Sequence, residues 1–299
     1  MAGFKHMTYF IMATDPLHVG TGGYRIGRVD NSILRDPSTN LPKIPGSSIS
    51  GVIRNYAIWN EKDTEKKGAM LKCYENEKAQ KGGCGKCDIC RVFGYSNKEK
   101  NLMGSVKFFD AQIVFFPVMT LLGPKWMTTT NILKDQFNIT LNQNLTRENI
   151  LTDFDIQQGK LNLGWIYLNA TKINSEITLP PSLAPYKGKI VVVDESLFST
   201  IVNMNLEVRT SVRIDPTSGS AVDGALFTYE AIPRSTLLSF DVVYESFRAG
   251  DGKLAPTLET SKALVQSGMA LLNVMGIGGM NTRGFGRINK LHKIEKQEA

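Results

Sequence analysis

The stretch Ile44-Pro45-Gly46-Ser47-Ser48-Ile49-Ser50-Gly51-Val52-Ile53-Arg54 contains the start of the first helix expected along the chain. Pro45 keeps the residues before it extended. Ser47 or Ser48 can cap a helix that runs to about Trp59. Apolar residues recur at helical spacing and give this helix one broad apolar face: Ile49, Val52, Ile53, Tyr56, Ile58 and Trp59.

Extended segments lie on both sides of this helix. Runs rich in β-branched, aromatic and other apolar residues predict strands at Met7–Thr14, Ser105–Val118, Lys189–Val193, Met204–Ile214, Leu237–Tyr244 and Arg287–Ile294. Val29–Arg35 is expected to be a further extended piece. A second helix is predicted over Thr257–Met275, where apolar residues again repeat at helical spacing. Strands that flank two good helices indicate an α+β fold.

Length and composition describe an ordinary globular chain with insertions. The chain has 299 residues, of which 42% are apolar and 21% charged, and this excludes a disordered protein. We expect a single elaborated domain over 1–299. Two segments interrupt its pattern: residues 61–104 are lysine-rich and hold every cysteine, and residues 126–187 are rich in Asn and Thr.

The start of the chain and its charge suggest where it works. The run MAGFKHMTYFIMATDPLHVG lacks a signal-peptide layout, because its apolar part is short and ends at Asp15-Pro16. No stretch approaches the ~18 apolar residues of a spanning helix, so we expect a cytoplasmic protein without a membrane partner. The 35 basic and 28 acidic residues give a net charge of +7, which permits a nucleic-acid partner without requiring one.

The four cysteines predict a metal site. Cys73, Cys84, Cys87 and Cys90 lie in one short window, whereas a disulfide framework would spread them along a secreted chain. Four thiolates are enough to close a tetrahedral zinc site with a structural role. An iron–sulfur cluster is the rival, but the polar surroundings and the lack of a Pro after the last Cys favour zinc.

A glycine-rich segment near the C-terminus has two interpretations. Residues 276–287 read Gly-Ile-Gly-Gly-Met-Asn-Thr-Arg-Gly-Phe-Gly-Arg and match neither the dinucleotide fingerprint nor the P-loop. Backbone N–H groups at Gly278 and Gly279, with Arg283 and Arg287, can approach phosphates. A tight turn between helix and strand needs glycine equally, so the spacing alone leaves both roles open.

No layout for a nucleophilic enzyme is present. The chain has three histidines, and His18 is the only one in a glycine-rich loop of the kind that builds sites. Asp30 and Asp36 follow it, although Asp36-Pro37-Ser38-Thr39 is a good turn sequence and surface carboxylates often serve solvation alone.

Several of these motifs together resemble the RAMP superfamily of CRISPR proteins. Its N-terminal signature is similar to His18-Val19-Gly20-Thr21-Gly22, Val29-Asp30, Arg35-Asp36 and residues 44–54, and its defining loop is similar to Gly276–Gly286. The segments Asp110-Ala111 to Val118 and Asp215 to Glu230 resemble the repeated backbone subunit of type III-B (Cmr) effector complexes. The four-cysteine site is a departure, since it is more familiar from the type III-A (Csm) backbone.

The resemblance implies a fold and an activity. The fold is a ferredoxin-like (RRM-like) core whose insertions form fingers, palm and thumb, with the thumb hairpin within 205–233. Copies would stack along a CRISPR RNA with other type III subunits. Each copy would cleave the complementary single-stranded target RNA at regular intervals, as an endoribonuclease that needs Mg²⁺ or Mn²⁺ and leaves a 2′,3′-cyclic phosphate.

The same resemblance implies which residues act. Asp30 corresponds to the catalytic aspartate of the family, and His18, Tyr229 and Glu230 match further positions linked to cleavage. The helix start with Ser47, Ser48 and Arg54 can hold a guide phosphate. A-form backbone can be gripped without reading bases, which suits Lys, Arg and glycine N–H groups.

Two other functions stay open from the sequence. One is a catalytically silent scaffold that binds the guide. The other is a RAMP endoribonuclease that processes guide precursors, for which His18 is the only general acid/base candidate. Loss of target cleavage in Asp30→Ala with intact assembly would argue against the silent scaffold. Cleavage of precursor RNA by the purified monomer would favour the processing endoribonuclease.

Overall fold

The computed structural model describes residues 3–22, 29–78, 83–96, 101–157, 159–247 and 256–296. The helices are α1 (Gly46–Trp59), α2 (Thr64–Lys78), α3 (Asp88–Phe93), α4 (Thr130–Phe137), α5 (Glu195–Met204), α6 (Leu258–Met269) and α7 (Leu272–Met275), with 3₁₀ turns η1 (Pro181–Tyr186) and η2 (Asn281–Arg283). The strands are β1 (Phe4–Ala13), β2 (Tyr95–Ser96), β3 (Asn101–Leu102), β4 (Val106–Phe108), β5 (Gln112–Thr120), β6 (Gly123–Thr129), β7 (Asn149–Thr152), β8 (Lys160–Leu163), β9 (Ile166–Lys172), β10 (Ile190–Val193), β11 (Glu207–Ile214), β12 (Ala221–Ala231), β13 (Leu237–Glu245) and β14 (Ile288–Lys296).

The centre of the molecule has ferredoxin-like topology. Along the chain, β1 is followed by α1, then β4 and β5, then β13, α6 and β14. In the sheet, β14 pairs with β1, β1 with β13, and β13 with both β4 and β5, all antiparallel. This is the βαββαβ order 4-1-3-2, with β4 and β5 together as the second strand. The predicted α+β core is confirmed.

Alternation along β1 explains how both faces of this sheet are buried. Tyr9 belongs to the core cluster that contains α1 and α6, whereas its neighbour Phe10 belongs to a second cluster with Phe137 of α4. The helices α1 and α6 pack closely at Gly268, where an added Cβ would lie 2.2 Å from the Ile53 carbonyl oxygen. A larger side chain at this position would push the two helices apart.

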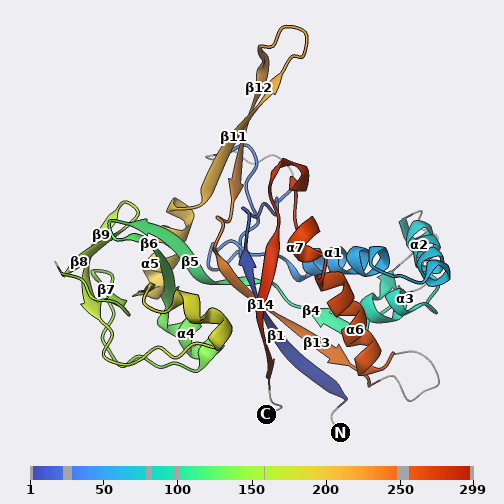
Figure 1. The fold of residues 1–299 in the computed structure, drawn as a ribbon, viewed down its shortest axis with the longest axis horizontal. Coiled ribbons are helices and arrows are strands. Elements are labelled where there is room, and N and C mark those ends of the chain that lie inside the picture. The colour runs from blue at the N-terminus through green and yellow to red at the C-terminus, as the bar shows by residue number, and fades with distance from the viewer. Residues whose placement is uncertain are drawn as a thin grey trace.

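The segment between β5 and β13 builds a lobe of its own. The second half of β5 pairs with β6, and β10, β7, β9 and β8 extend the sheet from there. The lobe curls back on itself, because the Gly164 N–H after β8 donates to the Met119 carbonyl of β5 at 3.0 Å. In Figure 1 this lobe lies on the left, away from α1, α2, α3 and α6 on the right.

A long hairpin projects from the molecule. Strands β11 and β12 pair antiparallel with each other, from Glu207 opposite Ala231 out to Ile214 opposite Ala221, and with no other strand among the described residues. Figure 1 shows the hairpin extending upward, far beyond the rest of the fold. A hairpin thus lies within residues 205–233, and its base contacts Leu17 and Asn31.

Three local predictions were wrong. Ser105–Val118 is not one strand: at Ala111 the chain leaves β13 and exchanges two backbone hydrogen bonds with Ile44. Thr257–Met275 is two helices, since the Leu271 N–H turns to the Gly268 carbonyl. The extended piece at residues 29–35 makes isolated bridges to three partners. Helix α1 has no side-chain cap, because Ser47 and Ser48 already lie inside it.

Within the described ranges, no helix is both long enough and apolar enough to cross a lipid bilayer.

Candidate functional site

Asp30 lies at the base of the hairpin, against strand β12. Its Oδ2 accepts hydrogen bonds from the Thr228 N–H (2.8 Å) and hydroxyl (2.7 Å), and the Asp30 N–H donates to the same hydroxyl oxygen at 2.9 Å. These bonds, the hydroxyl bond first, hold the pKa of Asp30 below its ordinary value because they favour the charged form. The side chain is exposed, and no described residue bonds to Oδ1. One oxygen of an ionised carboxylate therefore faces solvent.

His18 is buried beside strand β12 and is only 6% exposed. Its Nδ1 lies 2.7 Å from the backbone carbonyl oxygen of Glu230. A carbonyl only accepts, so Nδ1 is the donor in this contact. Nε2 faces Gly20, where an added Cβ would lie 3.2 Å away. His18 is thus held in one orientation by β12.

Glu230 is committed to contacts within the protein. Its Oε1 accepts from Arg35 Nη2 at 2.6 Å, and its Oε2 accepts from the Ile33 N–H at 3.3 Å. Arg35 is tied further to Asn203 Oδ1 at 2.8 Å. The Glu230 side chain is 9% exposed, so this is a largely buried ion pair. Glu230 therefore acts here as a clamp between the hairpin and residues 33–35.

Tyr229 connects the same strand to the glycine-rich loop. Its hydroxyl oxygen accepts from Arg283 Nη1 at 2.6 Å, and the guanidinium carbon lies 5.9 Å from the ring centre. The His18 ring meets the Tyr229 ring edge-on, with centres 6.3 Å apart. Asp30, His18, Tyr229 and Glu230, the four residues selected as catalytic, thus gather at the hairpin base. Their consecutive contacts on β12 make that strand the hub of the site.

The glycine-rich loop is packed tightly on the His18 segment. Gly278 has φ +88°, and an added Cβ would lie 2.5 Å from the His18 carbonyl oxygen. The Gly279 N–H donates to that same oxygen at 2.8 Å. Glycine is thus needed here for close backbone approach. Of the two arginines, Arg283 is exposed beside Tyr229, whereas Arg287 forms a two-pronged ion pair with Asp15.

The start of α1 holds an internal carboxylate. Asp110 Oδ1 accepts from the Gly46 N–H at 2.8 Å, and Lys43 Nζ lies 2.8 Å from its Oδ2. Asp110 thereby satisfies the helix end that Ser47 and Ser48 were expected to cap. Ser47 is exposed, Ser48 is half-buried and Arg54 lies nearly two turns further along.

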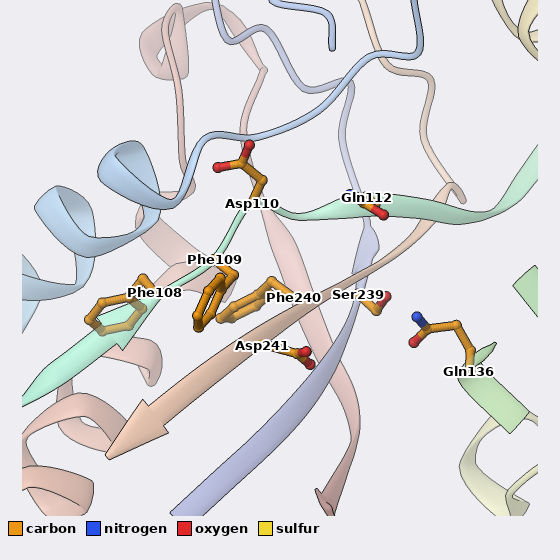
Figure 2. A pocket seen from close by; sticks show the side chains of 8 residues that line it. All are labelled: Phe108, Phe109, Asp110, Gln112, Gln136, Ser239, Phe240 and Asp241. Carbon is orange, nitrogen blue, oxygen red and sulfur yellow. The ribbon is translucent and has the colours of Figure 1, made fainter. Parts of the chain in front are cut away.

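A groove beside Asp110 differs from the hairpin site in chemistry. Figure 2 shows Asp110 below the chain that leads into α1, with Phe109, Gln112 and Asp241 along the groove. The eight lining residues include two carboxylates and neither Lys nor Arg. This groove therefore does not favour a phosphate backbone.

The four cysteines meet where α2 ends and α3 begins. Their Sγ atoms all lie within 4.8 Å of one another, with Cys73 and Cys90 buried. N–H groups also point at sulfur: Cys84 N lies 3.1 Å from Cys73 Sγ, and Cys87 N lies 3.1 Å from Cys84 Sγ. Zn–S bonds of ~2.3 Å in a tetrahedron separate sulfurs by roughly 3.8 Å. The cluster could thus hold a single metal ion such as zinc.

The thiols of this cluster titrate unequally. Burial raises the pKa of Cys73 to about 12. Hydrogen bonds from Cys87 and then Cys73 lower the pKa of Cys90 to about 5, against the effect of its burial. Thiolate character thus concentrates at Cys90, in the middle of the group. A bound cation would stabilise all four as thiolates.

Reasoning from the sequence did not identify Thr228 as the partner of Asp30, or Arg35 as the partner of Glu230. Thr228 is 198 positions from Asp30, and a lone threonine in a strand carries no signal of its role. Arg35 and Asp110 stood within the resembling motifs but received no role. Their contacts join segments that only the folded chain brings together.

The glycine loop, the His18 loop and the projecting hairpin can be compared with known families. A family model described as "RAMP superfamily" matches residues 10–289. The chain belongs to the RAMP superfamily. The predicted membership is therefore confirmed, and within this superfamily the chain is similar to both Cmr and Csm proteins.

Two relatives illustrate this. "CRISPR system Cmr endoribonuclease Cmr4" of Pyrococcus furiosus is 26% identical over 297 residues, covering 91% of this chain and 90% of that protein. "CRISPR system Cms endoribonuclease Csm3" of Methanothermobacter thermautotrophicus is 38% identical over 99 residues, covering 32% of this chain and 36% of that protein.

Solved structures share the RAMP fold of this chain. One chain of the type III-B Cmr-beta complex bound to cognate target RNA has a TM-score of 0.64 at 19% identity, covering 96% of each chain. Oligomeric Cmr4 from Pyrococcus furiosus has a TM-score of 0.61 at 20% identity, covering 98% of this chain and 99% of that one. At these identities the likeness establishes the fold.

Proposed function

We propose that this protein is a CRISPR RNA-binding backbone subunit of a type III effector complex. It assembles with further copies of itself and other effector subunits along the guide, and it cleaves complementary target RNA through Asp30. The observation that carries this proposal is the solvent-facing carboxylate of Asp30, fixed to the base of a projecting hairpin. The relatives named as Cmr and Csm endoribonucleases support the reaction class.

The reaction is an in-line transfer within the target RNA. The 2′ oxygen of one nucleotide forms a bond to the adjacent phosphorus, and the bond from phosphorus to the 5′ oxygen of the next nucleotide breaks. One proton leaves the 2′-OH and one is delivered to the 5′ oxygen, which yields a 2′,3′-cyclic phosphate and a 5′-OH. The protein contributes by holding the RNA in line and orienting the 2′-OH through Asp30 Oδ1.

The other residues at the hairpin base position this carboxylate. Glu230 and Tyr229 bind Arg35 and Arg283, so we assign them to holding the three segments together. His18 is held by the Glu230 carbonyl with its Nε2 facing Gly20, and it is the remaining candidate for proton transfer.

Guide binding is assigned to backbone and basic groups. The glycine-rich loop presents exposed Arg283, and the start of α1 offers Ser47, Ser48 and Arg54 to a phosphate. The net charge of +7 favours a polyanion. Arg287 already pairs with Asp15, so its contribution to phosphate binding requires exchange of that partner.

Two metal roles belong to this proposal. Zinc at Cys73, Cys84, Cys87 and Cys90 has a structural role, because four protein ligands leave no open position. The catalytic ion is Mg²⁺ or Mn²⁺, which would supply charge neutralisation at the phosphate. In the described chain no group of three or more His, Cys, Asp or Glu ligands gathers at Asp30, so that ion would need RNA oxygens and water as further ligands.

The test compares two aspartates in the assembled complex with labelled target RNA and Mg²⁺. Asp30→Ala should lower the cleavage rate by at least ~100-fold, the scale for losing a positioned catalytic group, with guide binding nearly unchanged. Asp36→Ala is the matched control, because Asp36 Oδ1 is occupied by Ser38 N and Oγ and its Oδ2 by Lys43. Wild-type cleavage in Asp30→Ala would refute the assignment.

A further inference from the structure

The contact between Asp30 and Thr228 is reciprocal. The threonine hydroxyl donates to Asp30 Oδ2 at 2.7 Å and accepts from the Asp30 N–H at 2.9 Å, while the Thr228 N–H donates to Oδ2 at 2.8 Å. Only a hydroxyl side chain of this length can both donate and accept at that position. Valine has the same shape and can do neither.

The contact continues a ladder along the outer edge of β12. The Asn31 N–H donates to the Thr228 carbonyl at 3.0 Å, and the Glu230 N–H donates to the Asn31 carbonyl at 3.0 Å. The next group on this edge is the Thr228 N–H, and it bonds to Asp30 Oδ2 where a neighbouring strand would supply a carbonyl oxygen. The hairpin itself thus sets the direction of the carboxylate.

We infer that Thr228 is a positioning residue for target-RNA cleavage: its hydroxyl fixes Asp30 Oδ2 on β12 so that Oδ1 is directed at the RNA. This inference rests on the proposed function. It assigns to the hairpin a task in cleavage, since any movement of β12 carries the carboxylate with it.

The structure distinguishes this role from a purely structural one. Thr228→Val removes both hydroxyl bonds but keeps the backbone N–H bond to Oδ2, so Asp30 stays nearby with greater freedom of rotation. Partners that orient a catalytic or metal-binding group typically change activity or metal affinity by ~10-fold or more when they are lost. The accompanying loss of hydrogen bonds to the ionised carboxylate also lets the pKa of Asp30 rise towards its ordinary value.

The experiment uses the assembled complex with guide RNA, labelled target RNA and MgCl₂ under single-turnover conditions. Thr228→Val should cleave about 10-fold more slowly and need more Mg²⁺ for half-maximal rate, with target binding within about 2-fold of wild type. Thr228→Ser, which keeps the hydroxyl, should restore the rate to within about 2-fold. Thr171→Val, an exposed threonine on β9, is the control for the substitution itself and should match wild type.

Two results overturn the inference while leaving the function intact. One is a wild-type rate and Mg²⁺ requirement for Thr228→Val in a complex where Asp30→Ala is inactive. The other, which remains decisive if Thr228→Val assembles poorly, is a Thr228→Ser complex that assembles fully but cleaves as slowly as Asp30→Ala. Absence of cleavage by the wild-type complex would instead refute the proposed function.

Discussion

Replacing Glu230 distinguishes a clamp from a catalytic acid. In Glu230→Ala, Arg35 loses its carboxylate partner in a site where the two side chains are 22% and 9% exposed, and the Ile33 N–H loses its acceptor. Breaking a buried ion pair from one side costs about 3–5 kcal/mol, and the partial exposure of Arg35 favours the lower end, about 3 kcal/mol. Glu230→Gln keeps an acceptor for Arg35 but removes the charge, so we expect about half that loss.

These free energies convert into a measurable shift. The unfolding entropy of a chain of this length is roughly 0.6 kcal/mol/K at the midpoint, so 3 kcal/mol lowers Tm by about 5 °C. Thermal unfolding by circular dichroism should therefore place Glu230→Ala about 5 °C and Glu230→Gln about 2–3 °C below wild type. Glu176→Ala is the control, since its ion pair with Lys187 is highly exposed and should leave Tm unchanged.

The rate of target-RNA cleavage, measured at temperatures below the unfolding transition, decides which role Glu230 has. A clamp predicts that the Gln variant retains most of the activity and that the Ala variant loses activity together with stability. Wild-type Tm in Glu230→Ala, or an inactive Glu230→Gln with wild-type Tm, would refute the clamp and support direct participation in catalysis.

Four further predictions concern other parts of the chain. Protein purified without chelators should contain about one metal ion per chain by elemental analysis, and Cys87→Ser should lose it; absence of both zinc and iron from the wild type contradicts this. Gly278→Ala should lower Tm by about 2–5 °C, because φ is +88° and the new Cβ meets the His18 carbonyl oxygen; an unchanged Tm means that the loop moves away freely. Arg283→Glu should weaken binding of all guide sequences alike and reduce its salt dependence, and a loss confined to one guide sequence argues against phosphate contact. The Ser38 hydroxyl is the main cause that lowers the pKa of Asp36, so the Asp36 carboxylate stabilises the fold above the unfolded pKa near 3.8 and loses this effect at more acidic pH. The Tm difference between wild type and Asp36→Ala should therefore shrink as the pH falls below about 4. A Tm difference that stays constant contradicts this.

The sequence alone determined whatever depends on local pattern or on residues close in the chain. The helical face of residues 49–59 and the strand residues around it were enough for an α+β core, because periodicity records which side of an element is buried. The cysteine window was likewise sufficient to predict that the four thiols gather at one place, since they come from 18 consecutive residues. The motifs around His18, residues 44–54 and Gly276 were enough to indicate the superfamily.

Tertiary structure decided how distant segments complete one another. The break at Ala111 and the start of α1 without a serine cap follow from Ile44 and Asp110, which come together only when the connection between β4 and β5 lies against the start of α1. Glu230 resembled a catalytic residue by position, yet its carboxylate binds Arg35, 195 positions earlier. Thr228 gave no signal in the sequence, because the value of a hydroxyl depends on what faces it. Here that is Asp30, which folding brings to within hydrogen-bond distance across 198 residues.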